Sequence, residues 1–226
     1  MKVILLVTIL CLTIIMPARA QKKAFNKALA DSLNSWALLD QVAAKAPEGK
    51  YKAMGWEKFG QFQDSVFDAH QLLLSKVFDL YGYPGYDLVG QKGSNNFWLM
   101  VQHCDKHLAF QQKVLNAMKK ELAKNNADSK NYAYLTDRVK INTRQKQVYG
   151  TQLTYNTDSC QAIPKPLADS LNVNQRRKEV GLEPIEKYLD SMSELHFMMN
   201  KATYEKKGIT GPKLLTVPKE NNSDKP

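Results

Sequence analysis

Two histidines and an aspartate form the group of side chains in this sequence that is best suited to proton transfer. His103, Asp105 and His107 fall within five consecutive residues, and an imidazole can accept or donate a proton near neutral pH. On a helix, the four-residue spacing would place both imidazoles on one face, where they could chelate a metal. Zinc proteases also need a glutamate after the first histidine, and Cys104 occupies that position.

We therefore expect no metal at this stretch and interpret His103 as a candidate general base. Asp105 or Asp137 would orient its ring. The alternative is structural, with one histidine hydrogen-bonded inside the core and the other partly solvated.

A second concentration of polar side chains begins with Asp137 and Arg138 and continues through residues 147–152, Gln-Val-Tyr-Gly-Thr-Gln. The glycine permits close backbone approach, while amides and hydroxyls donate and accept hydrogen bonds. This composition is typical of a binding surface. A helix-terminal charge pair followed by a solvent-exposed hairpin is the alternative interpretation.

Two arginines, Arg176 and Arg177, stand where we expect a later helix to begin. Positive charge in the first turn of a helix is unfavourable with the helix dipole, so a carboxylate or an anionic ligand there would offset a cost. The candidate catalytic residues are His103, Asp105, Arg138 and Tyr149, and the candidate ligand-binding residues are Gln102, Gln147, Gln152, Arg176 and Arg177.

The N-terminal residues 1–20 resemble a secretory signal peptide. Lys2 precedes an apolar run from Val3 to Met16, and the chain then continues with a proline and the triplet 18–20, Ala-Arg-Ala. This pattern predicts cleavage after Ala20 and a periplasmic or extracellular protein. The run is shorter than the roughly 20 residues that span a bilayer, and the sequence predicts no membrane span in the remaining chain.

The charge of the chain does not predict a nucleic-acid partner. The full sequence has 32 basic and 22 acidic residues, and removal of residues 1–20 leaves 30 basic residues and a net charge of +8. The lysines are scattered and no nucleic-acid-binding motif occurs, so nucleic acid is not an expected partner. We expect a small anionic ligand or a glycan as the partner. Cys104 and Cys160 could pair in an oxidising compartment, or Cys104 could be a buried apolar residue.

The spacing of apolar residues predicts a mainly helical chain. Helices are expected over residues 25–46, 56–81, 95–124 and 129–139, followed by a short one that Asn174 caps and a last one that starts near Pro184. In the first helix the apolar face is Phe25, Leu29, Leu33, Trp36, Leu39 and Val42. Val101, Leu108, Leu115 and Leu122 recur every seven residues in the third, with Gln111 as a polar residue beside them.

Between the helices, alternation around residues 149–155 indicates a short strand or hairpin arm, and residues 156–171 read as a loop. We therefore expect one helical domain over residues 21–207 with a small β-hairpin or irregular polar insert near 140–165. The polar segment 208–226, with three prolines, is expected to be a disordered tail.

At these motifs the sequence resembles a bacterial family that is described only as a domain of unknown function. The family pattern is matched by residues 82–84 (Gly-Tyr-Pro) with 89–90 (Val-Gly), 102–105 (Gln-His-Cys-Asp), 135–139 (Leu-Thr-Asp-Arg-Val), 147–152, and 176–188 with its two arginines. The resemblance covers roughly residues 55–190. Tyr83 replaces the usual tryptophan and His107 replaces an acidic residue, which puts a two-histidine metal site in doubt.

The resemblance implies that the candidate residues belong to one feature, but it assigns no activity or cofactor. Three functions fit the residues. The protein could be a hydrolase of the cell envelope, in which His103, Asp105, Arg138, Tyr149 and Arg176 line a polar pocket. It could instead be a non-catalytic module that binds a ligand, or the polar residues could form a buried structural network. The sequence does not indicate an oligomeric state.

Overall fold

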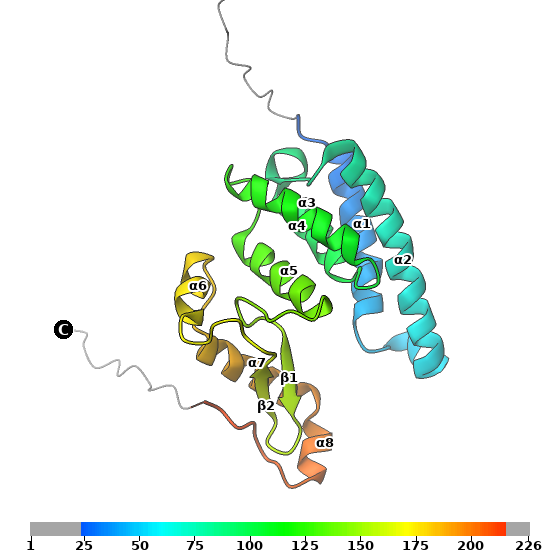
Figure 1. Cartoon of the computed structure of the whole chain (residues 1–226). Helices are drawn as coiled ribbons and strands as arrows, with labels where there is room; N and C mark the ends of the chain where they lie inside the picture. The colour runs from blue at the N-terminus through cyan, green and yellow to red at the C-terminus, as the bar shows by residue number, and fades with distance from the viewer. Residues whose placement is uncertain (1–23, 216–226) are drawn as a thin grey trace, which may run out of the picture.

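The computed structural model describes residues 24–215 (Figure 1). The predicted signal peptide, with its cleavage position, and residues 216–226 of the predicted tail lie outside the described residues. None of the described helices is both long enough and apolar enough to cross a membrane.

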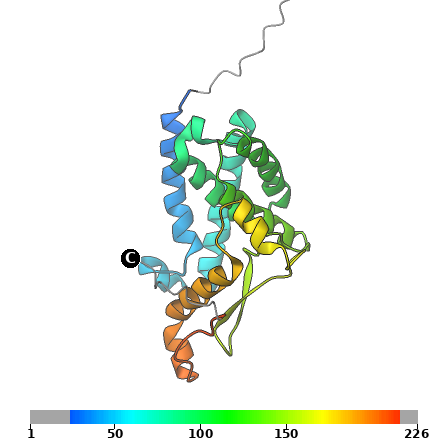
Figure 2. The ribbon, with the colours of Figure 1, turned by 90° about the vertical axis from the view of Figure 1, so that its left-hand side faces the viewer.

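The fold is mainly α, as predicted, with one small antiparallel sheet among the described residues. The first group of helices is α1 (Lys27–Ala44), the 3-10 helix η1 (Gly49–Met54), α2 (Gly55–Tyr81), α3 (Tyr86–Gln102), α4 (Leu108–Leu122) and α5 (Ser129–Asn142). Strands β1 (Leu153–Asn156) and β2 (Gln161–Pro164) and helices α6 (Val173–Glu179), α7 (Ile185–Met199) and α8 (Lys201–Lys206) follow. Helices α1 to α5 gather in one part of the domain, and the hairpin with α7 and α8 extends from it (Figures 1 and 2).

The large core lies among α1 to α5. It contains fully buried apolar side chains from each of these helices, such as Leu33, Leu74, Phe97, Val114 and Leu135. Helix α1 packs on α2 and α3.

The buried face of α1 differs from the predicted one. It consists of Ala30, Leu33, Ala37, Asp40 and Ala43. Phe25, Leu39 and Val42 of the predicted apolar face are exposed. Leu33 of that face is buried, and Leu29 and Trp36 pack partly buried against the core.

The single long helix predicted over residues 95–124 is wrong. Helix α3 ends at Gln102, α4 begins at Leu108, and residues 103–107 connect them. Gln111, the polar residue of the predicted apolar seam, donates from Nε2 to the carbonyl oxygens of Val101 (3.1 Å) and Gln102 (3.4 Å). The Val101 carbonyl also accepts from the Cys104 amide (3.1 Å), so Gln111 adds a side-chain donor to the backbone bonding at the end of α3. The seven-residue spacing of apolar side chains continues from α3 into α4 because both helices face the same core.

The hairpin and the last helices form a smaller cluster. β1 pairs with β2 in antiparallel register, from Leu153 opposite Pro164 to Asn156 opposite Gln161. The segment predicted as a loop over 156–171 therefore contains a strand. Ala162 of β2 packs with Val173, Ile185 and Leu189. Strand β2 is placed on α7 because its Ala162 N–H donates to Ser193 Oγ of that helix (2.8 Å).

The first part of the predicted tail, residues 208–215, is packed on this cluster rather than disordered. The Lys213 amide donates to the Ser159 carbonyl (2.9 Å) and the Leu215 amide to Asp190 (2.6 Å). Leu215 also adds its side chain to the small apolar cluster.

Candidate functional site

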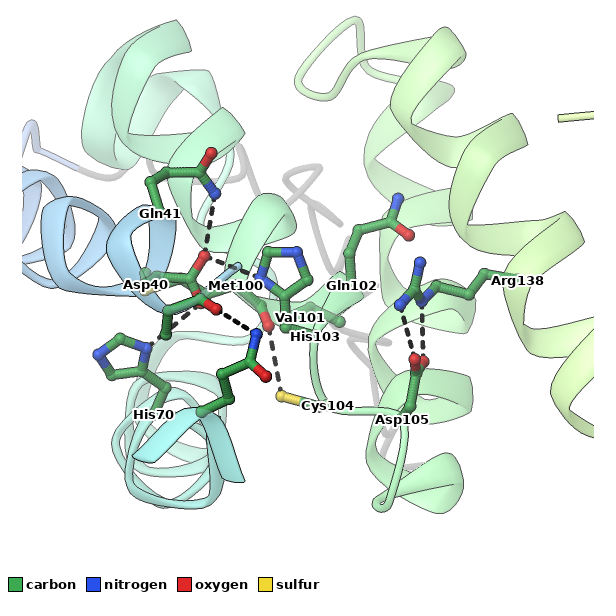
Figure 3. Close-up of polar contacts among 12 residues, drawn as sticks. Asp40, Gln41, His70, Met100, Val101, Gln102, His103, Cys104, Asp105 and Arg138 are labelled. Atoms are coloured by element: carbon green, nitrogen blue, oxygen red, sulfur yellow. Dashed lines mark hydrogen bonds and ion pairs between the residues drawn. The ribbon is translucent and has the colours of Figure 1, made fainter. Parts of the chain in front are cut away.

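The centre of the candidate site is a buried carboxylate on α1, that of Asp40. It is fully buried and accepts hydrogen bonds from His103 Nδ1 at 2.8 Å and Gln41 Nε2 at 3.1 Å (Figure 3). His70 Nδ1 of α2 lies farther away, 3.4 Å from the other carboxylate oxygen. Since an ionised carboxylate only accepts hydrogen bonds, His103 carries a proton on Nδ1. In the neutral ring Nε2 is then free to accept a proton.

Asp40 is held in its ionised form by these donors. Burial alone would raise the pKa of the carboxyl group, but the hydrogen bonds from His103 and His70, the charge of His103, and the bond from Gln41 together lower it. A buried carboxylate in this state fixes the orientation of the His103 ring.

The His103 ring lines a surface cleft of about 220 Å³. The other lining residues are Asp64, Phe67 and Asp68 of α2, Asp105, Lys106 and His107 of the α3–α4 connection, and Arg138 of α5. Phe67 packs on the imidazole with ring centroids 4.9 Å apart. Among residues 24–215, no hydrogen bond engages Nε2 of His103, so this atom is available to a molecule in the cleft.

Asp105 does not orient His103, contrary to the sequence prediction, and Asp137 does not either. Asp105 instead forms a two-bond pair with Arg138, with Nε–Oδ1 at 2.8 Å and Nη2–Oδ2 at 2.6 Å. Asn142 and Gln111 also donate to it. Burial would raise the pKa of Asp105, but Arg138, Gln111 and Asn142 lower it by hydrogen bonding and charge.

The two imidazoles that a helical four-residue spacing could bring together have different partners. His107 Nε2 lies 3.1 Å from Asp68, while His103 faces Asp40, because the residues between α3 and α4 are not helical. Within the described part of the chain, no group of three or more His, Cys, Asp or Glu side chains could hold a metal ion.

Within the described residues, Cys104 and Cys160 are unpaired and buried. Cys104 neighbours the candidate base in sequence, but burial, with nearby Asp40, raises the pKa of its thiol to about 12. The thiol is therefore protonated at neutral pH and is a poor nucleophile.

Asp137 is the centre of a second polar cluster. It is fully buried and accepts from the backbone amides of Val148 (2.7 Å), Tyr149 (3.0 Å) and Thr151 (2.9 Å) and from the Thr151 hydroxyl (3.0 Å). Four donors on one carboxylate hold the loop 147–152 against α5.

Gln147 closes this loop from within. Its Nε2 donates to the carbonyls of Gln152 (2.9 Å) and Lys165 (2.6 Å), and its Oε1 accepts from the Gln152 amide (2.9 Å). The amide-rich motif therefore uses its hydrogen-bonding groups mainly on its own backbone.

Both candidate arginines of α6 fasten the same loop. Arg176 donates to the Val148 carbonyl (3.0 Å) and pairs with Asp169 (3.0 Å). Arg177 is fully buried and donates to the Tyr149 carbonyl (2.7 Å) and the Glu183 carbonyl (2.6 Å).

These arginines lie inside α6, whose N-cap position is Asn172. The predicted cap residue Asn174 instead accepts from the Ile185 amide at the start of α7 (2.7 Å). The two helices follow each other closely, which allows a side chain of the first to cap the second.

The candidate residues thus occupy two regions rather than one pocket. His103, Asp105 and Arg138 line the cleft, whereas Gln147, Tyr149, Gln152, Arg176 and Arg177 surround the loop that Asp137 holds. Gln102 is buried at the end of α3. Asp137 and Arg138 are consecutive on α5, and their side chains extend to different regions. Helix α5 therefore connects the cleft to the loop.

The sequence reasoning missed Asp40. The signal for it was present, because Asp40 lies between Ala37 and Ala43 on the face of α1 that also carries Leu33. A carboxylate in a buried helical face requires a partner. Placing Asp40 on the buried face of α1 therefore predicts a contact such as the one with His103.

Comparison with known proteins gives a family but no activity. Residues 55–200 match a family model described as a family of unknown function, DUF6624. No curated protein and no solved structure matches the chain. His103, Asp105 and Arg138 lie within the matched residues, and Asp40 precedes them. Because the match covers more than half of the chain, the protein belongs to the DUF6624 family of unknown function.

Proposed function

We propose that the protein is a hydrolase in which His103 acts as general base and Asp40 orients it. One observation carries the proposal. The buried carboxylate binds Nδ1 of His103 at 2.8 Å, while Nε2 belongs to a ring that lines the cleft. In this arrangement Nε2 takes a proton from an attacking water molecule, and Asp40 stabilises the imidazolium that forms.

The lining of the cleft within residues 24–215 offers neither a hydroxyl nor a thiol nucleophile, and in our proposal water is the attacking group. The cleft is lined by no serine, threonine or cysteine among the described residues, and the thiol of Cys104 is protonated. Arg138 and Lys106 supply positive charge at the cleft, beside the carboxylates of Asp64, Asp68 and Asp105. Asp105 uses Nε and Nη2 of Arg138, which leaves the Nη1 group for negative charge that develops on the substrate.

The size of the cleft limits the substrate to one that inserts a small group. A volume of about 220 Å³ is below the range of pockets that enclose a drug-sized molecule. A larger molecule would therefore bind by one end. The predicted signal peptide supports a role for the protein outside the cytoplasm, on a component of the cell envelope.

The test is a hydrolysis assay on purified protein with chromogenic esters, amides, phosphoesters and glycosides. His103→Gln should lower kcat by about 100-fold or more on any substrate that is turned over, which is the usual contribution of a general base. His196→Gln of α7 is the matched control, because it makes the same change at a histidine that does not line the cleft. Equal activity of the His103 and His196 variants would contradict the proposal.

A non-catalytic binding module is the second candidate. It is supported by the pairing of charged groups at the cleft, where Lys106 contacts Asp64 (2.8 Å) and His107 contacts Asp68 (3.1 Å). Paired charges of this kind can recognise a polar ligand without chemistry. Saturable binding of a compound that wild-type protein never converts would favour this function over hydrolysis.

A further inference from the structure

Arg177 has an unused hydrogen-bonding edge although its side chain is fully buried. Its Nε donates to the Glu183 carbonyl and its Nη1 to the Tyr149 carbonyl, but the buried Nη2 group has no partner in the described structure. The ring of Tyr188 lies 4.8 Å from the guanidinium carbon. An unpaired donor on a buried cation is costly, and an oxyanion would satisfy both the donor and the charge.

A cavity of about 550 Å³ lies against this arginine. Its charged lining residues are Arg177, Lys130, Lys178 and Glu183, so three cations face one carboxylate. Tyr134, Tyr188, Gly181 and Leu182 complete the wall. The cavity is formed by α5, α6, the turn after α6 and α7, and it shares no lining residue with the His103 cleft.

The charge of Arg177 is only partly compensated within the protein. The two carbonyl oxygens and the Tyr188 ring contact it, but no carboxylate forms an ion pair with it among the described residues. Burial lowers the pKa of Arg177 even though Tyr134, Tyr188, Glu183 and Asp137 act in the opposite direction. This is the electrostatic situation that an anion would relieve.

We propose that this cavity binds a small organic anion whose carboxylate or phosphate group pairs with Nη2 of Arg177. Lys130 and Lys178 attract the anion at the mouth, and the tyrosine rings contact its apolar part. A guanidinium binds both kinds of oxyanion well. Because Nη2 is covered, neighbouring side chains must change conformation when the anion enters.

The experiment measures binding of benzoate, phenyl phosphate and inorganic phosphate by calorimetry and by chemical-shift changes. The first two probes separate a carboxylate from a phosphate requirement, and inorganic phosphate shows whether an apolar part is needed. We expect saturable binding of at least one aromatic probe, and Lys178→Glu should weaken it by about tenfold or more.

Lys58→Glu on α2 is the matched control, since it makes the same charge change at an exposed residue remote from the cavity lining. Arg177→Lys should abolish binding, and because it alters a buried residue, Lys130→Glu provides a second variant at an exposed residue. Circular dichroism verifies that each variant is folded. Absence of saturable binding by all three probes, or equal weakening by the Lys58 and Lys178 variants, would overturn the proposal.

Discussion

Asp40 and His103 lie 63 residues apart in the sequence, yet Oδ2 of the first is 2.8 Å from Nδ1 of the second. The contact joins α1 to the point where α3 ends. It also determines which nitrogen of His103 faces the cleft. Stability and the proposed chemistry therefore depend on the same pair of side chains.

Replacement of Asp40 should reveal how strongly this pair stabilises the fold. Asp40→Asn removes the buried charge and places an amide NH₂ where donors already point, so the free energy of unfolding should fall by about 3 kcal/mol. Urea denaturation measures this change. Asp31→Asn on the exposed face of α1, which loses only a solvated pair with Lys27, should change it little. A similar effect of both substitutions would contradict the role of Asp40.

The same carboxylate predicts a loss of stability in acid. Its pKa is lowered in the folded protein, so the folded state binds a proton less readily than the unfolded chain does. Its contribution is fully present above the unfolded pKa, near pH 4, and is lost as the pH falls through the lower folded value. Thermal unfolding between pH 6 and 2 should therefore show a shallower loss below about pH 4 in Asp40→Asn than in wild type. Parallel pH profiles would refute this.

The helical character of the chain could be predicted because it depends on local spacing of apolar residues. Helices α2 and α5 begin within one residue of the predicted starts. The break between α3 and α4 could not be predicted in this way, since Leu108 and Leu115 continue the apolar repeat of Val101 across it. What ends α3 is a set of contacts between distant elements, His103 with α1 and Asp105 with α5.

The candidate site could be predicted only in part, because residue types are visible in the sequence and contacts between distant elements are not. Residue types indicated His103 and Arg138 as functional candidates, but their partners follow from packing. Asp40 could not be identified from the face of larger apolar residues that was predicted for α1. It lies on the buried face with Ala30, Leu33, Ala37 and Ala43. Gln147 and Arg177 carry groups that suit ligand binding, yet most of their hydrogen bonds close on the backbone of the loop and of Glu183.

Gln111 offers a direct test of the helix break. Gln111→Leu would complete the apolar repeat, but it would leave the carbonyls of Val101 and Gln102 without their side-chain donor. We expect the free energy of unfolding to fall by about 1 to 2 kcal/mol, partly offset because Oε1 of Gln111 is itself buried without a partner. Gln112→Leu, the exposed neighbour, is the control. A more stable Gln111 variant would show that the apolar repeat is dominant.

Asp137 should control the order of loop 147–152. Asp137→Asn replaces one acceptor oxygen by a donor that faces N–H and O–H groups, so part of the loop loses its attachment to α5. Hydrogen exchange of the Val148 and Thr151 amides should become at least about tenfold faster, which corresponds to about 1.4 kcal/mol. Asp158→Asn in the exposed hairpin turn should leave these rates unchanged, and unaltered exchange in the Asp137 variant would disprove the assignment.

The pair of Asp105 and Arg138 can be assigned to stability or to function by a double-mutant cycle. Both side chains are partly exposed, with 44% and 27% of their surface accessible, so solvent screening should limit their coupling energy in unfolding to about 1 kcal/mol or less. Their position at the cleft predicts a larger effect there. Arg138→Lys should retain most of the stability but, because lysine cannot form the paired bonds of a guanidinium, lose substrate turnover or ligand binding. If turnover or binding in the Arg138→Lys variant matches that of wild type while Arg138→Ala unfolds readily, the pair is structural, and His103 alone defines the functional part of the cleft.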